Sequence, residues 1–277
     1  MKKLLLILLC LPMIGFGQQT YVPDYNFEAY LEANGMGNGI SSDDYVTTAN
    51  INTVTYLNVG DDNISDLTGI EDFIALTTLY CHTNELTSLD VSQNTALTFL
   101  GCSRNQLTSL DLSQNTALTE LSCNNNQLTN LDVSNNLALT YLDCENNQLI
   151  CLDISNNPNL EYLNCPDNLL EQLNTRNGNW VNMQIQAQTN NLSCVEVDNL
   201  GYANSTWTAW FDFQVPFNTN CNYANPCNSS TSIQEHTTNK ELLKVTDLLG
   251  RETKGTKNEV LFYIYDDGTV EKRIVIE

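Results

Sequence analysis

A period of 21 residues between Leu76 and Leu173 constrains this chain more than any other feature. Four successive blocks are LTTLYCHTNELTSLDVSQNTA, LTFLGCSRNQLTSLDLSQNTA, LTELSCNNNQLTNLDVSNNLA and LTYLDCENNQLICLDISNNPN, and a fifth begins LEYLNCPDNLLEQLN. A fixed period of this length is typical of stacked repeats. One block cannot fold alone, because burying its few apolar side chains yields roughly 1.5–3 kcal/mol each, whereas ordering every residue costs roughly 1.5 kcal/mol. The period therefore predicts a solenoid, in which neighbouring blocks share one core.

Two polar or polarisable residue types recur at fixed places in these blocks. The cysteines are Cys81, Cys102, Cys123, Cys144 and Cys165. The asparagines, three positions later, are Asn84, Asn105, Asn126, Asn147 and Asn168. We expect the thiols to be small buried hydrophobes, with a metal or redox role as the alternative. We expect each asparagine to satisfy backbone groups where the chain leaves a strand.

The pattern L-x-x-L-x-C-x-x-N-x-L resembles the leucine-rich repeat. The cysteine at the sixth position of so short a period resembles the cysteine-ladder repeats of internalin J-like bacterial surface proteins. The resemblance covers residues 54–198 and implies a curved solenoid, with a parallel β-sheet on the concave side and mostly short or irregular elements on the convex side. Degenerate repeats carry Val59 and Ala187 at the ladder position. They extend the stack to seven rungs, about 30 Å at roughly 4.8 Å per rung.

Shifts in composition divide the chain into six segments. A basic start and a short apolar run indicate a secretory signal, too short to span a membrane. An amphipathic stretch that follows Asp24 predicts a short helix that caps the N-terminal end of the repeats. The segments are a signal peptide at 1–17, an N-terminal helical cap at 18–53, the repeats at 54–198, a C-terminal cap at 199–221, a polar linker at 222–239 and a β-rich tail at 240–277.

Charge is distributed unevenly between these segments. Residues 18–239 contain 25 acidic residues and two basic ones, Arg104 and Arg176, whereas residues 240–277 contain eight acidic and seven basic ones. A body this acidic repels phosphate backbones and anionic lipids. We therefore exclude nucleic acid as a partner, and no segment is long and apolar enough to predict a transmembrane helix.

The tail predicts a hairpin in which Asp267 and Gly268 form the turn between Val260–Tyr265 and Val270–Ile276. Its stretches KVTDLLGRE and YIYDDGTVEKRIVI resemble the end of the type A C-terminal sorting domain of type IX secretion substrates. The resemblance implies contact with that secretion machinery, and a secreted or outer-surface location.

Nine cysteines follow the signal segment. Equivalent residues in adjacent rungs lie about 4.8 Å apart, wider than the roughly 3.8 Å between the Cβ atoms of a disulfide, so the ladder cysteines should stay unpaired. Cys151 and Cys194 occupy equivalent positions two rungs apart, which is too far to pair. Cys194 with Cys221 is the disulfide we favour, as a clamp on the end of the solenoid, and the pairing of Cys151 and Cys227 stays open.

Two further patterns each leave two interpretations. The repeated D-x-S-x-N spacing at Asp90, Asp111, Asp132 and Asp153 favours Asx turns, with calcium ligation as the alternative. The aromatic residues between Trp207 and Phe213 favour a cap over the open core, with a ligand-binding patch as the alternative.

In each strand, alternate side chains point into the core and out to the concave side, here called the strand face. Exposed aromatic rings among polar and acidic groups are typical of recognition surfaces. The alternative is that Tyr and Phe simply suit strands. The predicted ligand-binding residues are Tyr56, Tyr80, Phe99, Glu120, Tyr141, Asp143, Glu145, Tyr162 and Asn164.

No G-x-S-x-G, H-E-x-x-H, P-loop or C-x-x-C motif occurs, and we predict neither an enzyme nor a cofactor. The sequence predicts a secreted or cell-surface leucine-rich-repeat protein that binds a protein, or alternatively a glycan. A structural adhesion or matrix component without a dedicated ligand is the alternative function.

Overall fold

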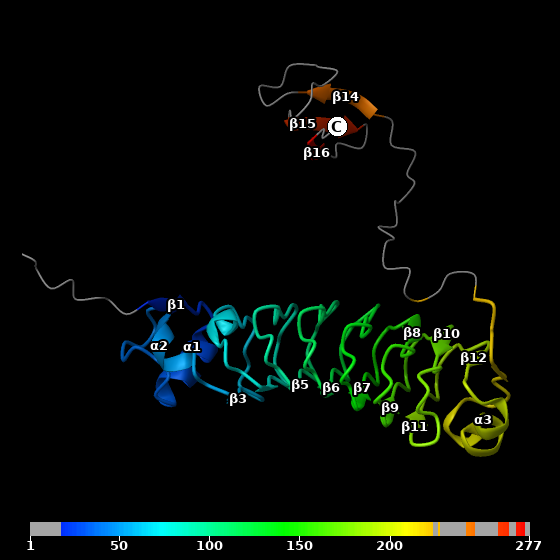
Figure 1. Ribbon diagram of the computed structural model, residues 1–277. Coiled ribbons are helices and arrows are strands. Elements are labelled where there is room, and N and C mark those ends of the chain that lie inside the picture. The colour runs from blue at the N-terminus through cyan, green and yellow to red at the C-terminus, as the bar shows by residue number, and fades with distance from the viewer. Residues whose placement is uncertain (1–17, 224–226, 228–241, 247–259, 266–269, 275–277) are drawn as a thin grey trace, which may run out of the picture. The chain divides into compact units, whose positions relative to one another are not determined.

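The computed structural model describes residues 18–223, 227, 242–246, 260–265 and 270–274. Figure 1 shows that the chain forms two compact units, one up to residue 228 and one from residue 229 on. The expected signal peptide, most of the linker and the predicted turn at Asp267 and Gly268 lie outside the described residues.

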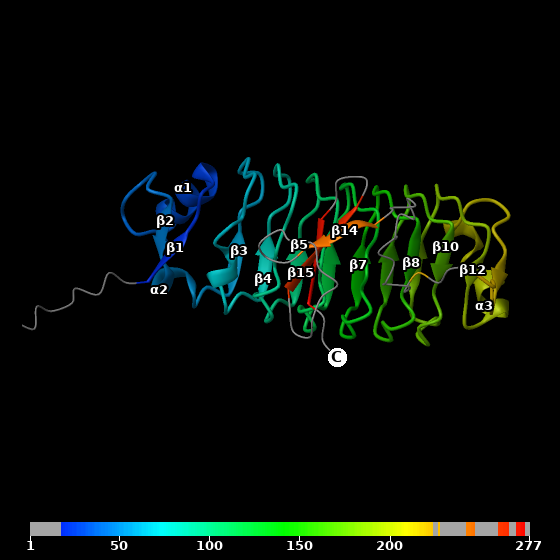
Figure 2. The same ribbon diagram turned by 90° about the horizontal axis from the view of Figure 1, so that it is seen from above.

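The first unit is a solenoid of stacked parallel strands, as Figure 2 shows from above. Its main sheet has seven strands in the order β11-β9-β7-β6-β5-β4-β3. Its rungs pair equivalent repeat positions, such as Leu79 with Leu100 and Leu100 with Leu121. The strands are β3 (Tyr56–Asn58), β4 (Thr78–Tyr80), β5 (Phe99–Gly101), β6 (Glu120–Ser122), β7 (Tyr141–Asp143), β9 (Tyr162–Asn164) and β11 (Gln184–Gln186). The leucine-rich-repeat solenoid predicted from the 21-residue period is confirmed.

A second parallel sheet lies on the other side of the last rungs, where the sequence predicts mostly irregular elements. It comprises β8 (Cys151–Asp153), β10 (Gln172–Asn174), β12 (Val195–Glu196) and β13 (Phe217–Asn218), in the order β13-β12-β10-β8. In earlier repeats Ser88, Ser109 and Asn130 occupy the position of Cys151. Serine and asparagine favour turns, which is consistent with strand pairing that begins only at β8.

The core of the solenoid consists mainly of leucine, isoleucine and valine side chains. It also contains the five ladder cysteines, which are fully buried and form no disulfide. Burial raises the pKa of the Cys102 thiol to about 12. It also raises the pKa of the other four thiols. These cysteines are therefore protonated, unreactive core residues at neutral pH.

Each ladder asparagine connects two rungs. Asn126 donates from Nδ2 to the Cys102 and Cys123 carbonyls at 3.1 and 3.0 Å, and its Oδ1 accepts from the Leu107 amide at 3.0 Å. A second ladder, formed by the last residue of each D-x-S-x-N pattern, consists of Asn94, Asn115, Asn136 and Asn157. Their Nδ2 groups donate to carbonyls of the preceding rung, but their buried Oδ1 atoms have no partner among the described residues.

The repeated aspartates form turns. The Oδ1 atoms of Asp90, Asp111, Asp132 and Asp153 each accept the amide two residues later at 2.8–2.9 Å. The Asx-turn interpretation of the D-x-S-x-N pattern is thereby confirmed.

The N-terminal end is covered by helix α1 (Tyr25–Ala33) with strands β1 (Gln19–Tyr21) and β2 (Tyr45–Thr47), followed by α2 (Thr48–Ile51) and the 3-10 turn η1 (Ile70–Asp72). The sequence predicts α1 but not the antiparallel β1–β2 pair. Asp24 caps α1 by accepting the Asn26 and Phe27 amides, and its other oxygen accepts from Ser65 and Asp66. This carboxylate therefore fixes the helix to the first repeat.

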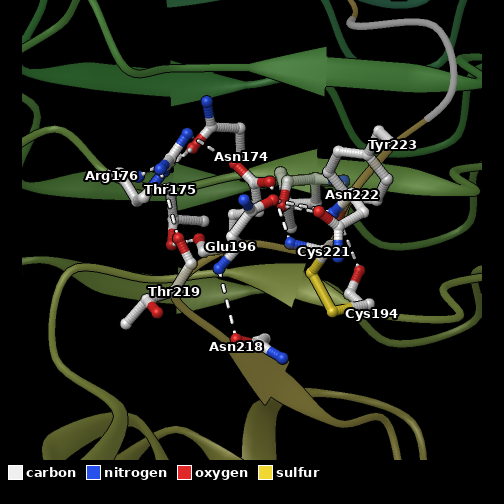
Figure 3. Close-up of a disulfide and its surroundings, with 12 residues drawn as sticks. Asn174, Thr175, Arg176, Cys194, Glu196, Asn218, Thr219, Cys221, Asn222 and Tyr223 are labelled. Atoms are coloured by element: carbon white, nitrogen blue, oxygen red, sulfur yellow. Dashed lines mark hydrogen bonds and ion pairs between the residues drawn. A yellow bond between two sulfur atoms is a disulfide. The ribbon is translucent and has the colours of Figure 1, made fainter.

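The C-terminal end is closed by α3 (Leu200–Thr206), the 3-10 turn η2 (Thr208–Trp210) and β13. Trp207, Phe211 and Phe217 are buried there, whereas Trp210 and Phe213 are exposed. Disulfides join Cys194 to Cys221 and Cys151 to Cys227. Figure 3 shows the first of these beside the ion pair between Arg176 and Glu196, whose nearest N···O distance is 2.7 Å.

The second unit contains three antiparallel strands, β14 (Leu242–Thr246), β15 (Val260–Tyr265) and β16 (Val270–Ile274), in that order. Strands β15 and β16 pair from Val260 opposite Ile274 to Ile264 opposite Val270. The two strands predicted for the hairpin are thus present, and the last two residues of the second predicted strand, 275 and 276, lie outside the described residues.

Candidate functional site

The strand face carries two separate groups of aromatic rings. The first contains Tyr56, Tyr80, His82 and Phe99, with centroids 5.9 Å apart for Tyr56–Tyr80, 6.2 Å for Tyr80–His82 and 4.5 Å for Tyr80–Phe99. Gly101 allows this contact, because a Cβ there would lie 3.0 Å from the Phe99 ring and 3.3 Å from the Tyr80 ring. His82 lies against Gly60 and 3.7 Å from Asp61.

The second group is the stacked pair Tyr141 and Tyr162, whose centroids lie 4.9 Å apart with an interplanar angle of 5°. Both rings are half-buried. Between the two groups β6 presents Glu120, which is exposed, and Ser122. The predicted residues therefore share one face but form two clusters separated by one rung, rather than a continuous aromatic column.

Acidic side chains lie beside the tyrosine pair. Asn164 donates from Nδ2 to Asp143 at 3.0 Å and to Glu145 at 2.9 Å, so the amide connects the two carboxylates. Partial burial raises the pKa of Asp143, and the neighbouring Glu145 charge adds to that effect. The pKa of Tyr141 is also raised, by burial and by the charge of Asp143.

Among the described residues, no lysine or arginine forms an ion pair with these carboxylates. Neither lysine nor arginine occurs at any of the outward positions of the seven strands. Arg104 lies at the turn after β5 in a left-handed conformation, with φ of 54°. The second arginine of the body, Arg176, is paired with Glu196 near the second sheet. The described strand face is therefore acidic.

Within the described residues no group of three or more His, Cys, Asp or Glu side chains is arranged to hold a metal ion. Among the same residues, no helix combines the length and hydrophobicity needed to cross a bilayer.

Stacked parallel strands, the two asparagine ladders and the buried thiols together define a leucine-rich-repeat solenoid with a cysteine ladder. A search against protein-family models finds no match. Internalin J of Listeria monocytogenes serotype 4b (strain F2365) is 42% identical over 75 residues, which are 27% of this chain and 8% of that protein.

A solved structure shows the same fold. The functional domain of internalin J from Listeria monocytogenes, which includes a cysteine ladder, matches with a TM-score of 0.52 and 29% identity, over 65% of this chain and 52% of that one. A leucine-rich-repeat protein of Leptospira interrogans matches with a TM-score of 0.49 and 22% identity, over 53% of this chain and 40% of that one. The chain thus spans about half the length of the internalin J domain. The similarity supports a bacterial leucine-rich-repeat protein with a cysteine ladder.

Proposed function

We propose that this protein is a secreted or cell-surface binding protein, not an enzyme, and that its strand face binds a basic segment of a partner protein. The observation that carries the proposal is the stacked pair Tyr141–Tyr162 beside Asp143 and Glu145, on a face without lysine or arginine. Tyrosine supplies contact area at a low cost in side-chain entropy. Uncompensated carboxylates favour lysine and arginine in the partner.

Export is part of the proposal. It is supported by the signal-like residues 1–17, by the resemblance of residues 240–277 to a type A sorting domain, and by the similarity to internalin J. We propose that the tail is recognised by the type IX secretion machinery. Deleting residues 240–277 should then retain the protein inside the outer membrane of a type IX-competent host, and undiminished release of the truncated chain would contradict this route.

The strand-face proposal is tested by a pull-down from host and environmental extracts with the chain from Gln18 onward, compared with a Tyr141→Ala, Tyr162→Ala and Asp143→Asn triple variant. Loss of the captured protein with an unchanged melting temperature is the expected result. Tyr25→Ala is the matched control, because this exposed tyrosine lies on α1 in the N-terminal cap and is not one of the strand-face residues.

The other outcomes identify the alternatives. Capture by both proteins would move the binding site off the strand face. Unchanged attachment of cells by the triple variant, without any captured protein, would favour a structural adhesion or matrix component. Capture that disappears after glycosidase treatment of the extract would favour a glycan on the strand face.

Binding should also depend on pH. Because the pKa of Asp143 is raised, this carboxyl becomes protonated at a higher pH than an ordinary aspartate, whose pKa is about 3.9. The affinity for a basic partner should therefore fall as the pH is lowered toward that raised value. In the Asp143→Asn variant this part of the pH dependence should disappear.

A further inference from the structure

A pocket of about 360 Å³ lies where the main sheet meets the C-terminal cap. One wall carries the rings of Tyr202, Trp207 and Trp210, from the cap. The other carries the amides of Asn182, Gln184 and Gln186, the last two from β11. Its size falls near the lower end of the roughly 300–1,000 Å³ that is usual for small-molecule sites.

The lining contains no aspartate, glutamate, lysine, arginine or histidine. This is unusual for a body with 25 acidic residues between positions 18 and 239. A charged ligand would lose hydration in the pocket without gaining a counter-charge. The pocket therefore favours an uncharged ligand. The pair Tyr141–Tyr162 with Asp143 and Glu145, here called the Tyr141 cluster, favours a cation.

Three lining side chains have unused binding capacity. The Trp210 side chain is exposed, at 47% for the residue, and its ring stacks on no other ring among the described residues. The exposed Gln184 amide has no hydrogen-bond partner in the described part of the chain. Gln186 donates only to the Tyr162 hydroxyl, at 3.2 Å. An amide offers both donors and acceptors, so these groups can bind hydroxyls.

We propose that this pocket binds a neutral sugar unit of a glycan, as a second site independent of protein binding at the strand face. A pyranose ring has an apolar C–H face that can stack on the Trp210 indole, and hydroxyls that can bond to the Gln184 and Gln186 amides. A purely apolar side chain from a protein would fit the rings, but it would leave these amides without partners at a cost in affinity.

The tryptophans provide a direct readout. The chain has three, Trp180, Trp207 and Trp210. Two line the pocket, and Trp180 packs on Tyr202 with ring centroids 4.9 Å apart. Intrinsic fluorescence of the full chain therefore reports on this region.

We would titrate the full chain with cellobiose, lactose, maltose and chitobiose. Glucuronic acid and glucosamine serve as charged probes, and N-acetyltryptophanamide serves as an apolar probe. A saturable emission change with at least one neutral disaccharide, and none with the charged sugars, is the expected result.

Variants assign the change to the pocket. Trp210→Ala and Gln184→Ala should each weaken disaccharide binding at least tenfold, measured by saturation-transfer NMR so that the readout does not depend on Trp210 emission. Phe213→Ala is the matched control, because this ring is 91% exposed in the same cap and does not line the pocket. Melting temperatures of all three variants should match that of the unmodified chain.

Three results would overturn the proposal: no response to any neutral disaccharide, equal affinity in the Trp210→Ala variant, or tighter binding of N-acetyltryptophanamide or a charged sugar. None of these results bears on capture of a basic protein by the Tyr141 cluster. The pocket proposal and the strand-face proposal can therefore be refuted separately.

Discussion

The middle repeats and the two ends of the solenoid are stabilised in different ways. In the middle, every rung repeats a buried set of aliphatic side chains, one thiol and one asparagine from each of the two ladders, and all five ladder cysteines are free. At the C-terminal end the cysteines face outward and form disulfides. At the N-terminal end one carboxylate, Asp24, connects the capping helix to the first rung. A middle rung has neighbours on both sides, whereas an end rung has one and needs contacts of its own.

The largest effect on stability should come from the disulfide between Cys194 and Cys221 at the C-terminal end. Replacing Cys194 and Cys221 with alanine removes a link across 27 residues of sequence. By loop-closure entropy the variant should lose about 3.5 kcal/mol of stability. Urea unfolding of the oxidised protein measures this, and dithiothreitol, which reduces both disulfides, should lower the stability of the unmodified chain by at least as much. Equal urea midpoints before and after reduction would mean that the cap holds without its disulfides.

The next effect should come from a middle asparagine. Asn126→Ala leaves the Leu107 amide and the Cys102 and Cys123 carbonyls without their side-chain partner in a buried site. The expected cost is about 3 kcal/mol. The adjacent Gln127→Ala, at an exposed side chain, should change stability by less than about 0.5 kcal/mol. If both variants had the same stability, the bridging role of the asparagine ladder would be refuted.

The ladder thiols should contribute less, through packing alone. Cys123→Ser introduces a more polar hydroxyl into a fully buried column and should cost about 2 kcal/mol. Cys123→Ala should cost about 1 kcal/mol, for the lost packing. A thiol reagent at pH 8 should label none of the five ladder cysteines in the folded protein and all five in urea, because burial raises the pKa of each thiol. Rapid labelling of the folded protein would show that the ladder is accessible.

The smallest effect concerns the N-terminal end and depends on pH. Burial alone would raise the pKa of Asp24, but hydrogen bonds from Ser65, Phe27 and Asp66 lower it. Because the folded pKa is the lower one, the stabilisation is present above the unfolded value of about 3.9 and is lost as the pH falls through the folded value.

Asp24→Asn keeps one capping oxygen but loses the carboxylate oxygen that accepts from the Ser65 and Asp66 amides. It should therefore cost about 1 kcal/mol at pH 7 and almost nothing near pH 2, where the native side chain is protonated too. Thermal melts at the two pH values measure the difference. Glu85→Gln, at an exposed side chain, is the control. A cost that is the same at both pH values would assign the effect to helix capping geometry instead of charge.

The sequence by itself determined the solenoid, because a strict 21-residue period permits only one stacking register. That register places Leu79, Cys81 and Asn84 and their equivalents in fixed columns. The aspartate turns and the Asp24 cap follow from local hydrogen bonding, which a short stretch of sequence contains. The outward positions of the strands also follow from alternation, so the residues of the strand face could be named without coordinates.

Tertiary structure decided what those outward residues form together. It divided the strand-face aromatics into two clusters, because Phe99 leans over Gly101 toward Tyr80 while Tyr141 stacks on Tyr162. It also added the second sheet and the pairing of Cys151 with Cys227. The pocket beside Trp210 arises where the cap meets β11. Such features depend on side-chain rotamers and on contacts between distant segments, and neither is encoded in the repeat period.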